Sequence, residues 1–359
     1  MKQFMRNFLL ATVPTLVVLF LVLEVLFRFV IVAPDPPRPC WDLKNNVMRF
    51  DTEGKRGGVF TVGRFGQQKG RWHINNYGWL SEVDYRPKSE RTKPLIAVIG
   101  DSYVEALQVN DDKSFVALLR RSLADSFDVY GFGFSGTALS GYLHLSRYVD
   151  RLFDPDVIVV NLVQNDFDES VWELFRSSDF LQVSVRGDSV VEIQPVPRHF
   201  NELKRFLFHS ALMRYVFYIS PNFFHRFNWN KPAAEGFVDN VAIKRMDKNR
   251  ETIERATRYL MGKIVEENRG RAVYFIMAAS RGDIYNGTLA TSSVFWMNSM
   301  VAGIAAGLPC TLIDQTDYFE RDYEANKKKF ESRYDGHWNE YGHYVTYRQL
   351  LDVLRKREG

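Results

Sequence analysis

Five short apolar segments alternate with longer amphipathic segments, and this alternation constrains the fold more than any other feature of the sequence. The apolar segments are 95–100, 127–132, 156–163, 272–279 and 310–314. Helical periodicity marks the segments 114–126 and 142–153, and it places Ile253, Ala256 and Leu260 on one face of a third helix. Strands that alternate with helices pair in parallel, so the pattern predicts an α/β sandwich with a five-stranded parallel sheet between two helical layers.

The predicted sandwich occupies residues 94–355 of the 359-residue chain, and a 46% hydrophobic content is enough to give it a sizeable core. An insertion at about 170–240 contains a possible hairpin that turns at 186–188, and we expect the insertion to cover one edge of the sheet. Residues 34–93 are rich in proline, glycine and charge, which predicts a stalk and a small β-rich lead-in.

Residues 1–33 contain a long apolar run, with no charge between Phe8 and Leu23. One interpretation is a cleaved signal peptide, whose apolar region spans roughly 7–15 residues before a small-x-small cleavage site. The run here is longer and ends in a proline-rich stretch beginning at Pro34, which favours an uncleaved membrane helix.

The charges around this helix predict its orientation. Lys2 and Arg6 precede the apolar run, so the positive-inside rule leaves the N-terminus in the cytoplasm and the rest of the chain outside it. Glu24 and Arg28 lie four residues apart near the outer end, where we expect them to pair or to reach the interface as anchors. The predicted location is a bacterial inner membrane, crossed once.

Charge and cysteine content argue against several classes of partner. The net charge is only +4 and the one short basic run is 327–329, which makes nucleic acid an improbable partner. Cys40 and Cys310 are too few for a disulfide framework; they either pair in an oxidising compartment or remain two buried thiols. No metal or cofactor is expected, because Asp335, His337 and His343 have no third histidine or HExxH helix beside them.

Polar residues and glycines follow the predicted strands, at the sheet edge where open parallel sheets bind their ligands. They are the pairs 101–102, 135–136 and 165–166, and near the C-terminus the triplet 335–337. A serine that opens a helix is most often only an N-cap. Together, however, these segments supply a hydroxyl, a backbone donor, a carboxamide and a histidine beside a carboxylate, which acyl transfer through a serine ester requires.

Four short blocks in this order, "GDSY", "GFSGT", "VQND" and "DGHWN", resemble those of the SGNH or GDSL hydrolase superfamily over residues 94–355. The resemblance implies a flavodoxin-like three-layer sandwich and a serine esterase. By position, Ser102 would be the nucleophile, His337 the general base and Asp335 the carboxylate that orients it. The oxyanion hole would combine the backbone N–H groups of Ser102 and Gly136 with the Asn165 amide, supported by Asp101 and Asp166.

The sequence departs from the family pattern at two places: the first alters packing but leaves Asn165 in place, and the second concerns the substrate. Val163 stands where the third block usually has glycine, and Tyr334 stands three residues before His337 where the family usually has aspartate. The "DGHWN" form is similar to that of polysaccharide O-acetyltransferases and of membrane-anchored relatives. It implies an esterase or O-acyltransferase acting on acetylated cell-envelope or exported polysaccharide, with a small ester or acylated carbohydrate as substrate and envelope polysaccharide machinery as a possible partner.

Two alternatives remain at this point. A conventional α/β-hydrolase would need a glycine where Thr137 follows Ser135 and Gly136, so Ser135 is a weak candidate nucleophile. A catalytically degenerate scaffold that binds a glycan on the same fold would be expected to have lost at least one of the four block residues, and none is lost. Hydrolysis and acyl transfer share the acyl-serine, and the sequence does not separate them.

Overall fold

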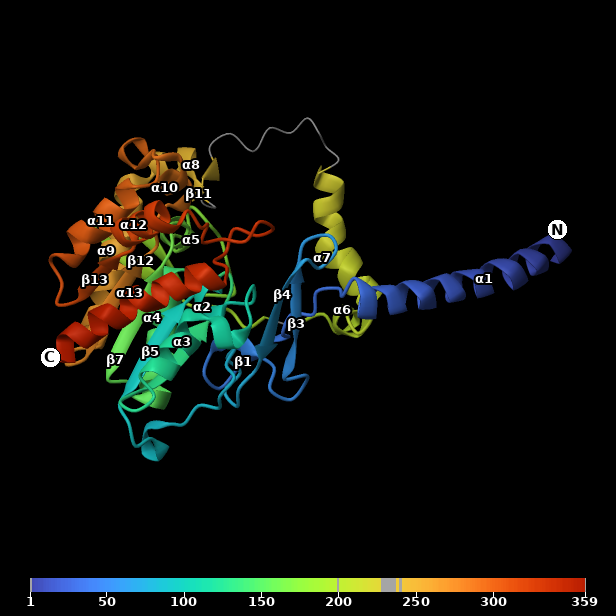
Figure 1. Ribbon diagram of the computed structural model, residues 1–359, viewed down its shortest axis with the longest axis horizontal. Coiled ribbons are helices and arrows are strands. Elements are labelled where there is room, and N and C mark those ends of the chain that lie inside the picture. The colour runs from blue at the N-terminus through green and yellow to red at the C-terminus, as the bar shows by residue number, and fades with distance from the viewer. Residues whose placement is uncertain (1, 199, 227–236, 239–240, 359) are drawn as a thin grey trace.

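The computed structural model describes residues 2–198, 200–226, 237–238 and 241–358. Its centre is a parallel five-stranded sheet in the order β13-β12-β7-β5-β6 (Figure 1). The strands are β5 (Leu95–Gly100), β6 (Asp128–Gly133), β7 (Val157–Leu162), β12 (Ala272–Met277) and β13 (Thr311–Asp314). Numbered along the chain, the order is 2-1-3-4-5, the flavodoxin-like arrangement. The predicted α/β fold class and all five predicted strands are therefore confirmed.

Alternate side chains of each strand enter separate cores on the two faces of the sheet. In β5, Ala97 and Ile99 belong to one core, whereas Ile96 and Val98 belong to the other. The first core is closed by α4 (Leu139–Phe153), α9 (Arg250–Glu267) and α11 (Trp296–Ala305). The second is closed by α3 (Phe115–Ser122), α10 (Arg281–Asn286), α12 (Thr316–Asn326) and α13 (Glu340–Glu358).

The lead-in consists of two antiparallel hairpins, β1 (Pro39–Asp42) with β2 (Val47–Phe50) and β3 (Gly57–Val62) with β4 (Gln68–His73). The segment is β-rich as expected, but it packs against the sandwich instead of standing off as a stalk. Trp72, Trp79 and Tyr85 are almost fully buried in the core beneath α4 and α9. Short 3-10 turns, η2 (Lys88–Glu90), η3 (Asp111–Lys113) and η4 (Leu289–Thr291), complete the connections.

The insertion contains the predicted hairpin, formed by β8 (Gln182–Arg186) and β9 (Ser189–Ile193) around a two-residue turn. We expected the insertion to cover an edge of the sheet, and its hairpin does not lie there. The buried side chains of Leu181 and Val183 belong to the core under α4 and α9, and Arg147 of α4 pairs with Glu192 of β9. The hairpin therefore lies on the helical layer, because its apolar side chains pack there.

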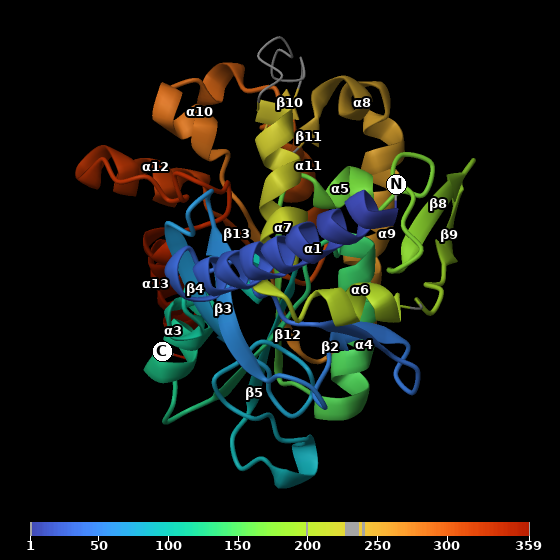
Figure 2. The same ribbon diagram turned by 90° about the vertical axis from the view of Figure 1, so that its right-hand side faces the viewer.

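The rest of the insertion runs to the N-terminal helix (Figure 2). Helices α6 (Glu202–Leu207) and α7 (Ala211–Arg226) lie beside the end of α1, while β10 (Phe237–Val238), β11 (Val241–Ala242) and α8 (Ile243–Lys248) lead back to the sandwich. Residues 227–236 and 239–240 of the predicted insertion lie outside the described residues.

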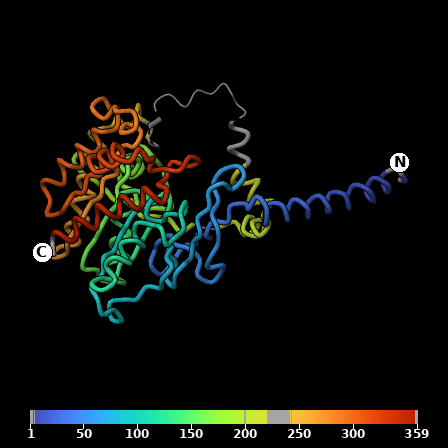
Figure 3. Tube along the Cα trace, viewed as in Figure 1, coloured from blue at the N-terminus to red at the C-terminus, as the bar shows by residue number. Residues whose placement is uncertain are grey.

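The N-terminal helix α1 (Lys2–Val25) continues into a π-helical turn, η1 (Leu26–Val30), and projects away from the body (Figure 3). Its segment Met5–Val30 is long and apolar enough to cross a membrane, and none of it is buried within the protein. Glu24 and Arg28 form the predicted ion pair, but they also join α1 to the insertion. The Glu24 carboxylate accepts hydrogen bonds from the backbone N–H groups of Ala211 and Leu212 at 2.9 and 3.1 Å, at the positive end of α7.

Candidate active site

The turn after β5 places Ser102 at the start of a short helix, α2 (Ser102–Glu105). Gly100 is required there, because a Cβ atom on it would lie 2.4 Å from Cγ2 of Val104. The N-cap of α2 is Asp101, whose carboxylate accepts the backbone N–H of Tyr103 at 2.9 Å. Because Asp101 caps the helix, the hydroxyl of Ser102 is not needed as a cap and can face the loop that carries His337.

Ser102, His337 and Asp335 form one continuous chain of hydrogen bonds. The Ser102 Oγ lies 2.8 Å from His337 Nε2, and His337 Nδ1 lies 2.5 Å from Asp335 Oδ1. The same carboxylate accepts the backbone N–H of His337 at 3.0 Å and an amide hydrogen of Gln108 at 3.3 Å. The structure thus brings together the three residues predicted as a triad, in the geometry that lets an imidazole take a hydroxyl proton.

The electrostatics of the pair favour a charged imidazole. Burial alone would lower the pKa of His337, but the hydrogen bond and charge of Asp335, aided by the charge of Asp101, raise it above its usual 6.5. Burial would likewise raise the pKa of Asp335, yet the hydrogen bonds from His337 outweigh it and the pKa lies below its ordinary value. Each partner therefore stabilises the charged form of the other.

The loops that carry Gly136 and Asn165 flank Ser102, because β6 and β7 are the two neighbours of β5 in the sheet. Gly136 has a φ of +83°, in the left-handed region that favours glycine. Asn165 precedes the short helix α5 (Asp166–Glu169), and its side-chain amide hydrogen-bonds to Glu169. Asp166 fixes this turn by accepting the backbone N–H of Val163 at 2.7 Å and the hydroxyl of Tyr142 at 2.8 Å.

Buried carboxyl groups surround the turns that carry the candidate site. Burial raises the pKa values of Asp101 and Asp166, and it raises those of Glu105 and Glu169 to about 7. Glu105 also fixes the loop after β6, since Ser135 donates both its backbone N–H and its hydroxyl to the Glu105 carboxylate. Ser135, the rival nucleophile, is thereby hydrogen-bonded to an acid and not to a histidine.

Three of these supporting residues escaped sequence reasoning. Glu105 and Gln108 lie three and six residues after Ser102 in the otherwise apolar stretch "YVEALQV", and both are buried. Tyr103 donates its hydroxyl to the carbonyl of Gly336 at 3.3 Å and receives a hydrogen bond from Arg281 at 2.7 Å, which ties the histidine loop to α10. Glu105 and Gln108 could have been found from the sequence, because each is a polar residue inside an apolar run.

The other residues considered as metal ligands or disulfide partners are not part of the candidate site. His343 is buried, its Nδ1 accepts the backbone N–H of Phe115 at 3.3 Å, and burial lowers its pKa to about 3. Over the described ranges, no group of three histidine, cysteine or acidic side chains is placed to hold a metal ion. Cys40 and Cys310 are both free thiols.

A cavity of about 360 Å³ lies beside Asp335 and extends toward α7. Tyr334 and Asp335 line one side of it, Phe60 and Gly63 of the β3–β4 hairpin another, and Pro34 and Tyr218 lie on the side of α1 and α7. Of the triad, only Asp335 lines this cavity, which lies between the sandwich, the lead-in and the insertion.

No family model and no curated protein matches the chain. Solved structures are similar to it, including a member of the lipolytic protein G-D-S-L family from Veillonella parvula, with 13% identity and a TM-score of 0.39 over 72% of this chain and 97% of that one. The acetyl xylan esterase AlAXEase has 13% identity and a TM-score of 0.39, over 72% and 98% of the two chains. A two-domain esterase active on acetylated mannans has 11% identity and a TM-score of 0.39, over 74% and 49%.

The family named from the four sequence blocks is thus represented among the similar structures. These similarities concern the fold. The chemistry proposed below follows from the side chains of this chain.

Proposed function

We propose that the chain is a serine-dependent esterase or O-acyltransferase of the SGNH type. The observation that carries the proposal is the hydrogen-bonded sequence from Ser102 Oγ to His337 and on to Asp335, at the carboxyl ends of the sheet strands. A scaffold that only binds a glycan would not require a serine hydroxyl 2.8 Å from an imidazole whose other nitrogen is held by a carboxylate.

The triad and the oxyanion hole have different roles in the reaction. His337 Nε2 takes the proton of Ser102 as Oγ attacks the ester carbonyl carbon, while Asp335 holds the proton on Nδ1 and stabilises the imidazolium. The backbone N–H groups of Ser102 and Gly136 and the amide of Asn165 stabilise the negative charge on the carbonyl oxygen.

The intermediate then collapses in two steps. The imidazolium returns its proton to the leaving alcohol, and the acyl group remains as an ester on Ser102. Water or a sugar hydroxyl next attacks the carbonyl carbon of this ester and loses its proton to His337. The imidazolium then returns this proton to Ser102 Oγ as the bond between the acyl group and Oγ breaks. Water gives hydrolysis and a sugar hydroxyl gives acyl transfer, with the same groups acting in both.

We place this chemistry outside the cytoplasm, on the outer side of a bacterial inner membrane that α1 spans. The apolar side chains of α1 are exposed, as expected for a helix in lipid, and Lys2 and Arg6 lie in its first turns, before the apolar run. The Glu24 carboxylate at the N-terminus of α7 supports a retained anchor, because cleavage of α1 would remove a contact of the folded insertion.

The proposed substrate is an acetylated carbohydrate of the envelope or an exported polysaccharide, handled beside polysaccharide machinery. Two observations support it: the "DGHWN" block and the cavity of about 360 Å³ that Asp335 lines. The acetyl ester would enter along this cavity with its carbonyl carbon facing Ser102.

Covalent labelling of the full-length protein with a fluorophosphonate tests the proposal. We expect one modified residue, Ser102, with labelling abolished in Ser102→Ala and retained in Ser135→Ala. Modification of Ser135, or no labelling of folded protein, would contradict it and favour the scaffold. Acetate release from acetylated polysaccharide, measured with and without an unacetylated acceptor glycan, then distinguishes hydrolysis from transfer.

A further inference from the structure

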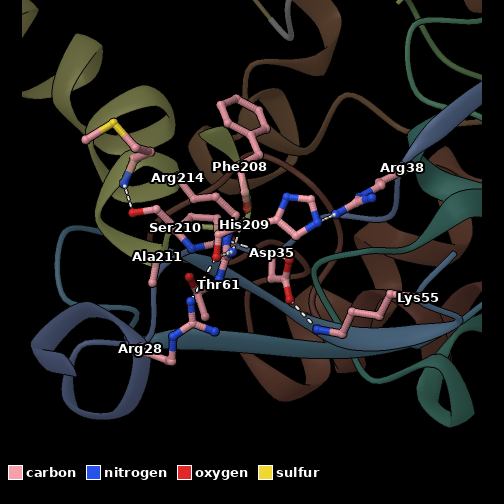
Figure 4. Close-up of polar contacts among 12 residues, drawn as sticks. Arg28, Asp35, Arg38, Lys55, Thr61, Phe208, His209, Ser210, Ala211 and Arg214 are labelled. Carbon is pink, nitrogen blue, oxygen red and sulfur yellow. Dashed lines mark hydrogen bonds and ion pairs between the residues drawn. The ribbon is translucent and has the colours of Figure 1, made fainter. Parts of the chain in front are cut away.

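A second cavity of about 440 Å³ lies where the N-terminal helix meets the body, and no triad residue lines it. Figure 4 shows polar contacts among residues at this cavity, including Arg28, Asp35 and Arg38. Of the residues described, seven basic side chains line it, among them Arg28, Arg38, Lys55, Lys204 and Arg214, against a single acid, Asp35. The walls between these charges are aromatic or proline, including Trp72, Phe208 and Pro36. We call this cavity the basic pocket.

Some of these cations hold the pocket together. Arg28 pairs with Glu24 and donates to the backbone carbonyl of His209 at 2.8 Å. Arg214 donates to the carbonyl oxygens of Pro34 and Phe208 at 3.0 and 2.8 Å. These contacts join α1, the following segment and α7 around the pocket.

Lys55 and Arg214 share one carboxylate, that of Asp35. On the rim, Arg198 pairs with Asp179, and Arg205 pairs with Glu202. Seven basic side chains therefore meet four carboxylates, which leaves three positive charges uncompensated.

Two cations at the pocket have no carboxylate partner among the described residues, Arg38 and Lys204. Arg38 Nη2 lies 3.0 Å from His209 Nε2, while His209 Nδ1 lies 3.0 Å from the carbonyl of Phe206. The carbonyl accepts a hydrogen from Nδ1, so Nε2 is left to accept one from Arg38. The ammonium group of Lys204 lies 5.3 Å from the ring centroid of Phe208 and 4.3 Å from that of Phe217. Both side chains keep donors for an anion.

The position of the pocket indicates the source of that anion. Arg28 belongs to the last turn of the apolar segment Met5–Val30, so the pocket lies at the depth of lipid headgroups if α1 spans a bilayer. Helix α6 beside it exposes Leu203, Phe206 and Leu207, with exposed fractions of 66%, 71% and 43%. Apolar side chains at i, i+3 and i+4 next to lysine and arginine are typical of a helix that lies in the interface of an anionic membrane.

We propose that the basic pocket binds the phosphate group of an anionic membrane lipid. The phosphate would lie between Arg38 and Lys204, where an arginine fork and a lysine ammonium provide charge-assisted hydrogen bonds. The acyl chains would run along α1 and the exposed side chains of α6. This site is separate from the triad, and it stands whether or not the chain is an esterase.

The test uses the full-length protein in a non-ionic detergent. Binding of dioctanoyl phosphatidylglycerol, dioctanoyl phosphatidylcholine, inorganic phosphate and inorganic pyrophosphate is measured by titration calorimetry. The variant Arg38→Gln/Lys204→Gln removes the two cations that lack a carboxylate partner. The matched control, Arg258→Gln/Lys263→Gln, removes two cations of α9 far along the chain.

We expect the wild type to bind phosphatidylglycerol at least tenfold more tightly than phosphatidylcholine. The pocket variant should lose at least tenfold in affinity for phosphatidylglycerol, since each charged hydrogen bond is worth about a tenfold factor, and the control should stay within about twofold. Thermal midpoint and hydrolysis of p-nitrophenyl acetate should be unchanged in both variants.

Three results would overturn the proposal. Equal binding of the two lipids, or an affinity for phosphatidylglycerol that the pocket variant leaves unchanged, would show that the pocket does not recognise the charge of the lipid headgroup. Tight binding of pyrophosphate without any preference between the lipids would assign the pocket to a soluble phosphate compound in place of a membrane lipid.

Discussion

Substitution of the buried acid Glu105 by glutamine is expected to change how the stability of the fold depends on pH. The carboxyl is buried beneath the loop that carries Ser135, and burial raises its pKa from 4.5 to about 7. Because the folded protein holds this proton more tightly than the unfolded chain, the stabilisation is fully present below pH 4.5 and is lost as the pH rises through 7.

The magnitude follows from the two pKa values. At 1.36 kcal/mol per pKa unit, the difference between 4.5 and about 7 corresponds to about 3 kcal/mol of unfolding free energy lost by the wild type over this range. Glutamine does not ionise, so Glu105→Gln should not lose it. Glu169 titrates in the same window, but it is present in both proteins and cancels in the difference.

The assay is denaturant unfolding of full-length protein at pH 5, 6, 7 and 8, followed by circular dichroism. The free energy of Glu105→Gln relative to wild type should rise by about 3 kcal/mol between pH 5 and pH 8. Glu53→Gln, at an exposed position, is the control and should show no such rise. A difference that stays constant within about 1 kcal/mol would refute the view that the fold keeps this carboxyl protonated near neutrality.

Three further predictions concern the triad, the candidate oxyanion loop and the membrane helix. Turnover of p-nitrophenyl acetate should fall with decreasing pH through a midpoint above 6.5, because neutral His337 is the base. Asp335→Asn should lower turnover by about 10⁴ and move this midpoint to lower pH. Near-normal turnover of Asp335→Asn would mean that Asp335 does not serve His337. Gly136→Ala should lower the free energy of unfolding by about 1–2 kcal/mol, because the φ of Gly136 is +83°, and it should also reduce turnover. Gly187→Ala, at a φ of +55° in the β8–β9 turn, should lower the thermal midpoint and leave turnover unchanged. Glu24→Gln should weaken the start of α7 by about 1 kcal/mol and speed proteolysis after α1, and unchanged digestion would argue against the joint.

The sheet could be predicted from the sequence because each of its strands is an uninterrupted apolar run between helices. The block order also placed Ser102, His337 and Asp335 on one edge, since parallel strands end on the same side. Local pattern did not decide which of two adjacent capping residues caps α2: Asp101 and Ser102 are equally good N-caps, and only the fold shows that Asp101 has the task.

The other differences between the sequence-based prediction and the structure come from contacts between distant segments. The burial of Glu105 depends on the loop after β6 crossing over α2, and the pairing of Glu24 with the start of α7 joins residues 187 positions apart in the chain. Hydrophobic periodicity describes one segment at a time, so it does not show which distant segment the insertion contacts. The hairpin of β8 and β9 was predicted for the converse reason, because its turn and both strands are neighbours in sequence.

The contact between Glu24 and α7 has a mechanical consequence. Phe27 stacks on Tyr215 with ring centroids 3.9 Å apart, so the end of α1 is held by a ring contact as well as by the carboxylate. A helix fastened in this way acts as a rigid mount, with little of the slack that a flexible leash would give. If the helix spans a bilayer, such a mount would set Ser102 at one height and one tilt above the lipid surface. Only esters that reach that height would then meet the serine.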